Sequence, residues 1–272
     1  MSRTMLRGLG ASLCASARRS AFAGGGRMRG RAISTPAAPV PRKWDVFEAD
    51  SSMYMPANST SKLVVFVRHA EGLHNAAHEE NEKLFWSEMW NSPKLWDAPL
   101  TDLGKEQSRL LGEELMNEGV NVDLVVVSPL TRTLQTAALS FGAVDPMVPM
   151  LACETCRERI AVYASEGRSK TSDLVVHWPK VNFSEVVSEE DPMFEHKETD
   201  EAVGERALLF LDWLMKRPEE RIAVVSHSVF LQQLYMQFQD TLPKEFFEAR
   251  QDFAKMKVVV VCPANGGKGE AQ

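Results

Sequence analysis

Residues 62–75 read KLVVFVRHAEGLHN, an apolar run that leads directly into a cluster of polar residues. Its first part, Lys62 to Val67, is short, apolar and rich in β-branched residues, which predicts a buried strand. Similar stretches lie at Val122–Val127, Arg221–Ser226 and Lys257–Val261. Because these runs are almost continuously apolar, they are typical of a sheet that is covered on both faces.

Helical patterns lie between the predicted strands. The helix predicted from Thr101 to Gly119 begins with a capping residue and has its leucines on one stripe: Leu103, Leu110, Leu111 and Leu115. Further helices are predicted at Leu130–Phe141, Asp200–Lys216 and Val229–Phe238. Alternating strands and helices predict an α/β fold of three layers, α/β/α, with a mainly parallel sheet and helices on both faces.

Basic side chains follow three of the predicted strands. Arg68 and His69 come after the first strand, Arg132 lies one turn into the helix after the second, and His227 follows the third. In a parallel sheet, ligands bind beyond the carboxyl ends of the strands. The sequence therefore predicts that two arginines and two histidines meet at one edge of the sheet.

Two helix N-termini are predicted at the same edge. Ser128 precedes Pro129, and Ser228 follows the second histidine, which are both favourable capping positions. Free N–H groups and the positive end of the helix dipole favour an anion there. Guanidinium groups offer paired donors to phosphate oxygens, and a neutral imidazole can carry a phosphoryl group covalently. The edge is suited to phosphoryl transfer, which also needs an acid for the leaving oxygen.

The same residues resemble a known family. Val67–Asn75, VRHAEGLHN, is similar to the R-H-G-E-x-x-x-N signature of the histidine phosphatase (phosphoglycerate mutase-like) superfamily. Four more segments follow in the family's order: Leu100–Gly104 (LTDLG), Ser128–Ala137 (SPLTRTLQTA), Arg157–Glu158 within CETCRERI, and Val224–Leu231 (VVSHSVFL). The resemblance spans about residues 62 to 261 and implies the histidine phosphatase fold.

Two segments are closest to the plant, algal and fungal phosphoglycerate mutase-like proteins. They are E-x-C-R-E at Glu154–Glu158 and WPKVNFS at Trp178–Ser184. Departures from the general family pattern are small. Ala70 stands where the signature has glycine, and Ser228 where glycine is frequent after the second histidine. Both residues are small, so a changed pocket wall is expected rather than an inactive site.

The resemblance implies a role for each strand-end residue. His69 would accept the phosphate as nucleophile, and the rest of the phosphate pocket would be formed by Arg68, Arg132 and His227. The family uses no metal, so neither a metal nor another cofactor is expected here. The expected partner is a small phosphorylated substrate.

Two further residues have alternatives. Asn75 would add a donor to the substrate phosphate, although a turn-forming role also fits it. Glu158, in the family's R-E position, would be the proton donor that phosphate ester cleavage requires. Glu154 is the alternative candidate for this role, and Glu158 could instead form a surface ion pair.

Three functions fit these residues. The segment after Glu158, AVYASEGRSK, lacks the clear substrate-recognition signature of glycolytic mutases, and the stretch from Arg132 to His227 is short for one. We therefore favour a metal-independent phosphatase, acting on a small phosphorylated metabolite through a phosphohistidine. The alternatives are a phosphoglycerate mutase and a non-catalytic relative that binds phosphate.

Charge is unevenly distributed along the chain. Residues 1–43 hold nine of the 31 basic residues and no acidic residue, which leaves 22 basic against 37 acidic residues, a net charge near −15, for the rest. Nucleic acid is not expected as a partner, because its binding relies on Lys and Arg. The longest apolar runs, such as Leu63–Val67, are too short to cross a bilayer.

Domain boundaries follow from these patterns. Residues 1–43 are rich in Arg, Ser, Ala and Gly, which predicts a transit peptide for a mitochondrion or plastid; the alternative is a disordered basic tail on a cytoplasmic protein. Residues 44–61 are expected to be a linker, 62–262 the histidine phosphatase domain, and 263–272 a disordered tail.

Some residues have no clear role in the sequence. His74 and His78 are expected at the surface, and Cys153 and Cys156 are expected to be structural thiols. Three tryptophans before the first long helix predict a lid or packing segment, or a stacking surface for an organic substrate: Trp86, Trp90 and Trp96. The oligomeric state stays open.

Overall fold

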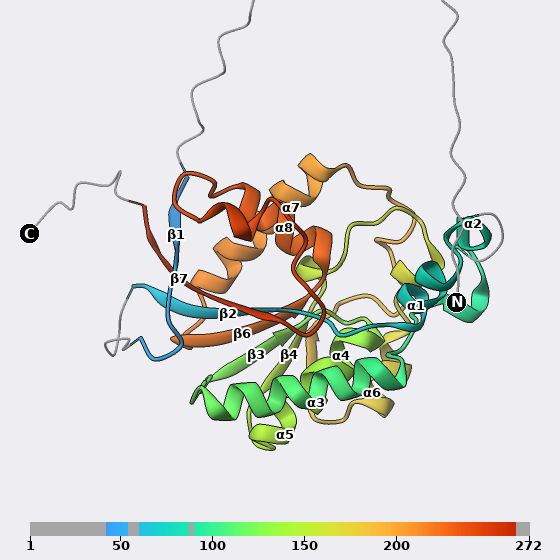
Figure 1. Cartoon of the computed structure of the whole chain (residues 1–272), viewed down its shortest axis with the longest axis horizontal. Coiled ribbons are helices and arrows are strands. Elements are labelled where there is room, and N and C mark those ends of the chain that lie inside the picture. Colours follow the sequence, from blue (N-terminus) through green and yellow to red (C-terminus); the bar gives the residue numbers. More distant parts are fainter. Residues whose placement is uncertain (1–41, 54–59, 87–89, 265–272) are drawn as a thin grey trace, which may run out of the picture. The chain divides into compact units, whose positions relative to one another are not determined.

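A seven-stranded sheet forms the middle layer of the structure, in the order β1-β7-β2-β6-β3-β4-β5 (Figure 1). The computed structural model describes residues 42–53, 60–86 and 90–264. The strands are β1 Trp44–Glu48, β2 Lys62–Arg68, β3 Leu124–Val127, β4 Met150–Cys153, β5 Val181–Glu185, β6 Arg221–Ser226 and β7 Met256–Pro263. The five adjacent strands β2, β6, β3, β4 and β5 pair in parallel, while β7 is antiparallel to both β2 and β1. The prediction of a mainly parallel sheet is confirmed.

Helices cover both faces of the sheet (Figure 1). They are α1 Leu73–Glu80, α2 Glu82–Leu84, α3 Asp102–Asn117, α4 Thr131–Leu139, α5 Phe141–Val144, α6 Thr171–His177, α7 Asp200–Met215 and α8 Ser228–Met236. Short 3₁₀ turns lie at η2 Pro93–Leu95, η3 Glu154–Cys156, η4 Ala164–Glu166 and η5 Lys244–Phe246. Among the described residues, no helix combines the length and apolar character needed to span a membrane.

Alternating residues of the central strands divide the core into two clusters. Val64, Phe66 and Val224 pack with apolar residues of α7 and α8. Val65 and Val67 pack on the other face with residues of α3 and α4. Successive side chains of a strand point to opposite faces, so strands that are apolar throughout need a helical layer on each side. The predicted three layers are confirmed.

Helix α3 begins as predicted, because Thr101 caps it by accepting a hydrogen bond from the Gly104 N–H at 2.9 Å. The predicted leucine stripe is only half right. Leu111 and Leu115 are buried, whereas Leu103 and Leu110 are more than half exposed. The helix rotates in this way because Gly104 lies against the Glu71 carbonyl, where an added Cβ would come within 2.1 Å of the oxygen.

The predicted linker over residues 44–61 is wrong for its first part. Trp44–Glu48 form β1, whose middle residue Val46 is 3% exposed and lies opposite Val261 of β7. Trp44 donates to Asp212 at 2.7 Å, which ties the strand to α7. An edge strand with one buried apolar residue lacks the apolar run that marks a central strand, which is why the sequence does not reveal it.

Both ends of the chain were also assigned from the sequence. Pro263 completes β7 and the Ala264 N–H donates to the Lys43 carbonyl, so the predicted tail over 263–272 begins inside the sheet. Residues 265–272 lie outside the described residues. The predicted transit peptide also lies outside them, apart from residues 42 and 43, and stays a prediction.

Strands β4 and β5 have no counterpart in the sequence analysis. Strand β4 has four residues, and β5 lies at the edge of the sheet with Phe183 as its one buried residue. Such short or mainly polar segments lack the pattern that predicts a strand.

A shortened chain tests the role of β1. A protein that begins at residue 49 should unfold at a temperature about 5 to 10 °C lower than one that begins at Pro41, because it loses buried Val46 and the pairing with β7. Calorimetry of both proteins measures the difference. Equal midpoints would mean that β1 contributes nothing to stability.

Candidate active site

His69 and His227 leave the sheet side by side. Strands β2 and β6 are parallel with Arg68 opposite Ser226, so the next residue of each strand lies beyond the same edge. The His69 N–H donates to the Ser226 carbonyl at 2.9 Å. The two imidazole rings are 5.1 Å apart between centroids, and both are buried.

The His69 ring is held in one orientation. Its Nδ1 lies 2.7 Å from the Ala70 carbonyl, and since a carbonyl oxygen only accepts, Nδ1 carries the proton. The unprotonated Nε2 accepts a hydrogen bond from Arg132 Nε at 3.3 Å. Burial, followed by the charges of Arg132 and Arg68, lowers the pKa of His69 well below its usual value. The imidazole is therefore neutral, with its Nε2 lone pair toward the guanidinium.

Arg132 joins the two histidines. It lies in the first turn of α4, is 1% exposed, and donates from Nη2 to His227 Nδ1 at 3.2 Å and from Nη1 to the Ser165 carbonyl at 2.7 Å. Burial lowers its pKa from the ordinary value. None of the three atoms that accept from Arg132 carries a formal charge, so the guanidinium can be shared with an anion.

Ser128 has a different place from the one predicted. It was expected to cap α4, but the N-cap is Leu130, and the Ser128 hydroxyl lies 2.7 Å from His227 Nε2. Because Arg132 donates to His227 Nδ1, Nε2 carries the ring proton and donates it to the Ser128 hydroxyl. The predicted cap at Ser228 is also wrong, because His227 occupies the N-cap position of α8.

Arg68 is the last residue of β2, directly before His69. Its guanidinium carbon lies 3.8 Å from the centroid of the Phe253 ring, and Nη1 donates to the Gln251 carbonyl at 2.8 Å. Burial lowers the pKa of Arg68 to about 10, which leaves it charged at neutral pH. Its Nε is buried with no acceptor among the described residues and can bind an anion.

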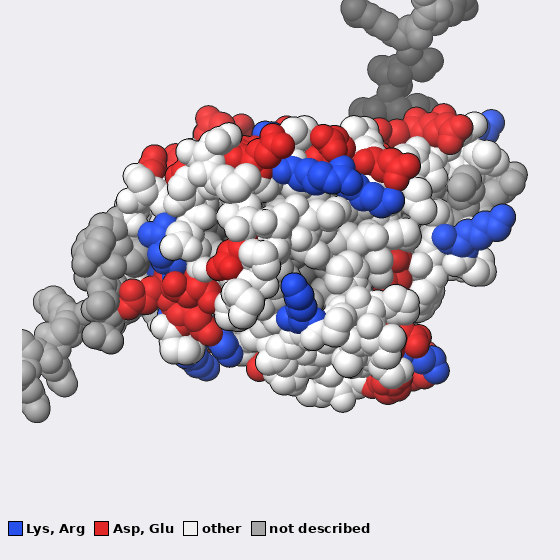
Figure 2. Space-filling model, turned by 90° about the horizontal axis from the view of Figure 1, so that it is seen from below, with Lys and Arg blue, Asp and Glu red and all other residues white. Residues whose placement is uncertain are grey.

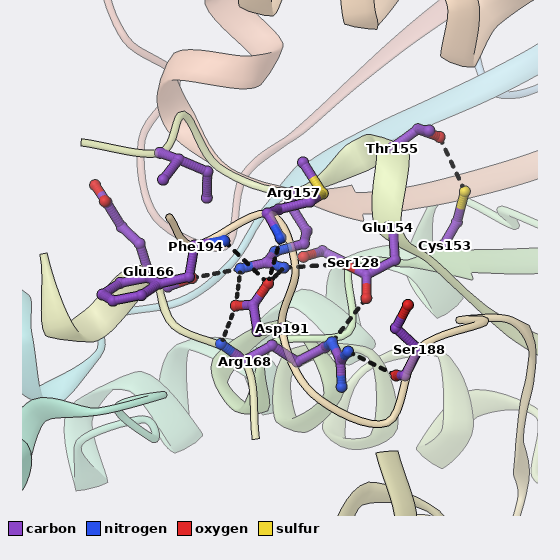
Figure 3. A network of polar contacts seen from close by, with 12 residues as sticks. Ser128, Cys153, Glu154, Thr155, Arg157, Glu166, Arg168, Ser188, Asp191 and Phe194 are labelled. Atoms are coloured by element: carbon purple, nitrogen blue, oxygen red, sulfur yellow. Dashed lines mark hydrogen bonds and ion pairs between the residues drawn. The ribbon is translucent and has the colours of Figure 1, made fainter. Parts of the chain in front are cut away.

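The two candidate acids lie in different surroundings. Glu158 lines the cavity, where its carboxylate accepts hydrogen bonds from the Val229 and Phe230 N–H groups at the start of α8. Glu154 instead forms ion pairs with Arg157 at 3.0 Å and Arg168 at 2.7 Å (Figure 3). It is not among the residues that line the cavity.

An open cavity of about 780 Å³ lies beyond the strand ends. It brings together Arg68, His69, Asn75, Arg132 and Glu158 from four separate segments of the chain. Asn75 lies in the first turn of α1, where its Oδ1 accepts from the Gly72 N–H at 3.0 Å. Its side chain thus has a turn-forming contact, and the residue also lines the cavity. The lining residues beyond these five are His74, His78, Glu79, Phe85, Trp86, Arg159, Tyr163, Ser165, Glu166, Ser228, Val229, Arg250, Asp252 and Phe253.

His74 was expected at the surface, but it is half-buried in the first turn of α1. It lines the cavity with its ring 6.0 Å from that of His69. Burial, together with Arg132 and Arg68, lowers the pKa of His74 well below its usual value. Its position directly before Asn75 in the signature segment was the available signal.

Glu166 is a further carboxyl group that lines the cavity, and the sequence analysis did not single it out. Its Oε2 accepts from the N–H groups of Ala161 at 2.6 Å and Tyr163 at 3.0 Å. Burial raises its pKa to about 7. The residue between the two donors, Val162, has a φ of 69°, which a β-branched residue rarely adopts.

Sequence comparison agrees with this geometry. The family model described as Histidine phosphatase superfamily (branch 1) matches residues 64–269. The chain belongs to this superfamily. It is 35% identical over 200 residues to phosphoglycerate mutase-like protein 1 of Arabidopsis thaliana, covering 62% of this chain and 69% of the relative. The predicted resemblance to the plant mutase-like proteins is confirmed.

Solved structures of the superfamily share the fold. The ecdysone phosphate phosphatase of Bombyx mori aligns with a TM-score of 0.52 at 16% identity, covering 78% of this chain and 97% of that one. A phosphoglycerate mutase of Bacillus anthracis aligns with a TM-score of 0.51, also at 16% identity, covering 75% and 89%. The predicted histidine phosphatase fold is confirmed.

The raised pKa of Glu166 predicts how the stability of this superfamily member changes with pH. The folded state binds the Glu166 proton more tightly than the unfolded state, so the stability it contributes is complete below about pH 4.5 and is lost as pH rises through about 7. Urea unfolding at pH 5 should give similar free energies for the wild type and Glu166→Gln. At pH 8 the variant should be more stable by roughly 2 kcal/mol.

Glu113→Gln is the matched control, because this residue is exposed on α3. Its difference from the wild type should not change with pH. If Glu166→Gln behaves in the same way, the Glu166 carboxyl titrates as an ordinary one.

Proposed function

We propose that the protein is a phosphatase that hydrolyses a small phosphorylated metabolite through a phosphohistidine on His69. The observation that carries this proposal is the neutral His69 ring, whose Nδ1–H is bound to a carbonyl while Nε2 faces the Arg132 guanidinium. That nitrogen is an available nucleophile next to donors for the transferred group.

The reaction has two steps. In the first, His69 Nε2 attacks phosphorus, the ester P–O bond breaks, and Glu158 donates its proton to the departing oxygen. In the second, water attacks the phosphohistidine, Glu158 takes a proton from this water, and the P–N bond breaks to release phosphate and regenerate neutral His69. The position of Glu158 on the cavity wall supports this role, as does the engagement of Glu154 with two arginines.

The phosphate would be held by Arg68, Arg132 and His227. Both guanidinium groups can neutralise the charge that develops on the phosphate oxygens. His227 can add a donor if the bound phosphate takes over the Arg132 Nη2 hydrogen bond, because Nδ1 can then carry the ring proton while the Ser128 hydroxyl donates to Nε2. The amide of Asn75 provides a further donor from α1.

The remaining charges of the cavity favour a phosphatase over a mutase, the alternative reaction. A phosphoglycerate mutase has to hold a substrate with a second anionic group. Beyond Arg68 and Arg132, the cavity is lined by two more arginines. Arg159 forms an ion pair with Asp200, and Arg250 is exposed. The acidic residues Glu79 and Asp252 also line it. We therefore expect no interconversion of phosphoglycerates, and release of inorganic phosphate from a substrate without a second anionic group.

A small molecule fits this protein better than nucleic acid. On the face seen in Figure 2, basic side chains are scattered among acidic ones rather than gathered in a patch. The cavity, by contrast, holds the buried Arg132 and the half-buried Arg68 where a single phosphate group would bind. We therefore propose a small phosphorylated substrate as the partner.

Replacement of the nucleophile is the first test. His69→Ala should abolish turnover, and rapid mixing with ³²P-labelled substrate should no longer give an acid-labile phosphoprotein. His177→Ala, an exposed histidine outside the cavity, is the control and should label like the wild type. Labelling that persists in His69→Ala but disappears in His227→Ala would reverse the assignment of the nucleophile.

The proton donor is tested with leaving groups of different basicity. Glu158→Gln should slow hydrolysis of an alkyl phosphate about 10²- to 10⁴-fold, because the alkoxide needs a proton as it leaves. Hydrolysis of 4-nitrophenyl phosphate, whose leaving group is stable without a proton, should keep most of its rate. Glu154→Gln should affect both substrates equally, and a leaving-group-selective defect in that variant would contradict the role of Glu158.

A further inference from the structure

Aromatic side chains form one wall of the cavity. Phe85, Trp86 and Tyr163 all line it, and we call these three residues the aromatic wall. Trp86 lies edge to face with both neighbours, at 5.0 Å from Phe85 and 5.2 Å from Tyr163 between centroids. The wall comes from two distant segments, the stretch after α1 and the loop before η4.

The wall is anchored from behind. Phe85 is 5% exposed and belongs to a small apolar core with Leu95 and Ala164. On the side of Tyr163, the Trp90 ring packs at 5.8 Å. Trp86, by contrast, keeps 43% of its surface exposed while it lines the cavity. An indole that is fixed at its edges and still exposed is available to contact a ligand.

The backbone that carries Tyr163 is strained. Val162, directly before it, has a φ of 69°, and Glu166 holds this turn by accepting from the N–H groups on both sides of Val162. A left-handed conformation at a β-branched residue is unfavourable and persists only where surrounding contacts impose it. The turn therefore maintains the position of Tyr163 against Trp86.

Trp96 lies elsewhere, although it belongs to the same tryptophan-rich segment. It is 41% exposed, does not line the cavity, and packs against Phe194 at 4.7 Å. Its ring also covers Gly167, where an added Cβ would come within 2.4 Å. Trp96 therefore packs the fold, whereas Trp86 faces the space where a substrate would lie.

The charges near the wall favour an uncharged group. His78 lies 5.5 Å from Trp86 between ring centroids, and the next residue, Glu79, also lines the cavity. Arg68 and Arg132 lie against the histidines instead, where Arg132 bonds to both His69 and His227. A substrate with its phosphate at His69 would thus have its leaving group available to aromatic rings.

We propose that the leaving group of the natural substrate carries an aromatic ring, which packs against Trp86 and Tyr163 while the phosphate lies at His69. This inference rests on the proposed phosphatase function and adds the class of substrate. The reaction is balanced as before: the ester P–O bond breaks, the aromatic alcohol leaves with the proton from Glu158, and water releases phosphate from His69. Specificity arises because aromatic rings attract one another beyond their apolar area.

A matched pair of substrates tests the proposal. Both 2-phenylethyl phosphate and 2-cyclohexylethyl phosphate release a primary alcohol, and they differ in whether the six-membered ring is aromatic. The wild type should hydrolyse the phenyl ester with a kcat/KM about fivefold higher, in line with one aromatic contact. Trp86→Leu should bring the ratio close to one, and Trp96→Leu, a tryptophan of similar exposure outside the cavity, should retain it.

A second measurement does not depend on any variant. The inhibition constants of 2-phenylethylphosphonate and 2-cyclohexylethylphosphonate, which cannot be hydrolysed, should differ in the wild type in the same direction. Equal hydrolysis and equal inhibition within each pair would overturn the aromatic preference but leave the phosphatase function standing. An aromatic preference that persists in both Trp86→Leu and Tyr163→Leu would also overturn it. If neither ester is hydrolysed and no phosphoenzyme forms, the proposed function itself fails.

Discussion

The parallel pairing of β2 with β6 is the constraint on which the rest of the site depends. Its register puts Arg68 opposite Ser226, and so His69 and His227 leave the sheet together. Both strands are buried on two faces, so a slip of one residue would disturb two packed layers at once. The apolar core therefore brings the two imidazoles together, and their polar contacts fix how each ring is turned.

Arg132 makes this pair of histidines suitable for an anion. Its buried guanidinium contacts two neutral rings and a carbonyl, and a buried cation without a contacting anion is unfavourable. The same charge, added to burial, lowers the pKa of both His69 and His227. A phosphate group would supply the missing negative charge, so the cost of burying Arg132 is offset when such a ligand binds. This arrangement is in place before any reaction begins.

A second polar network supports the first (Figure 3). Arg157 is fully buried and pairs with Asp191 at 2.6 Å, while it also donates to the Glu166 carbonyl. Arg132 donates to the carbonyl of the preceding residue, Ser165. The turn between the two networks is thus held from both sides, and it leads back to the strained segment that carries Tyr163. Loss of either arginine would loosen the cavity wall as well as its own contacts.

The sequence by itself determined the layers of the fold and the residues at the strand ends, because both depend on local signals. An apolar run marks a buried strand, and the residue after it lies at the edge where parallel sheets bind ligands. Edge strand β1 was missed, since one buried residue, Val46, makes no such run. Only the tertiary structure separated Glu158 from Glu154, through the ion pair of Glu154 with Arg168, which lies outside its own segment of the chain. It alone placed Trp86 against Tyr163, because contacts between loops leave no periodic pattern in the chain that forms them.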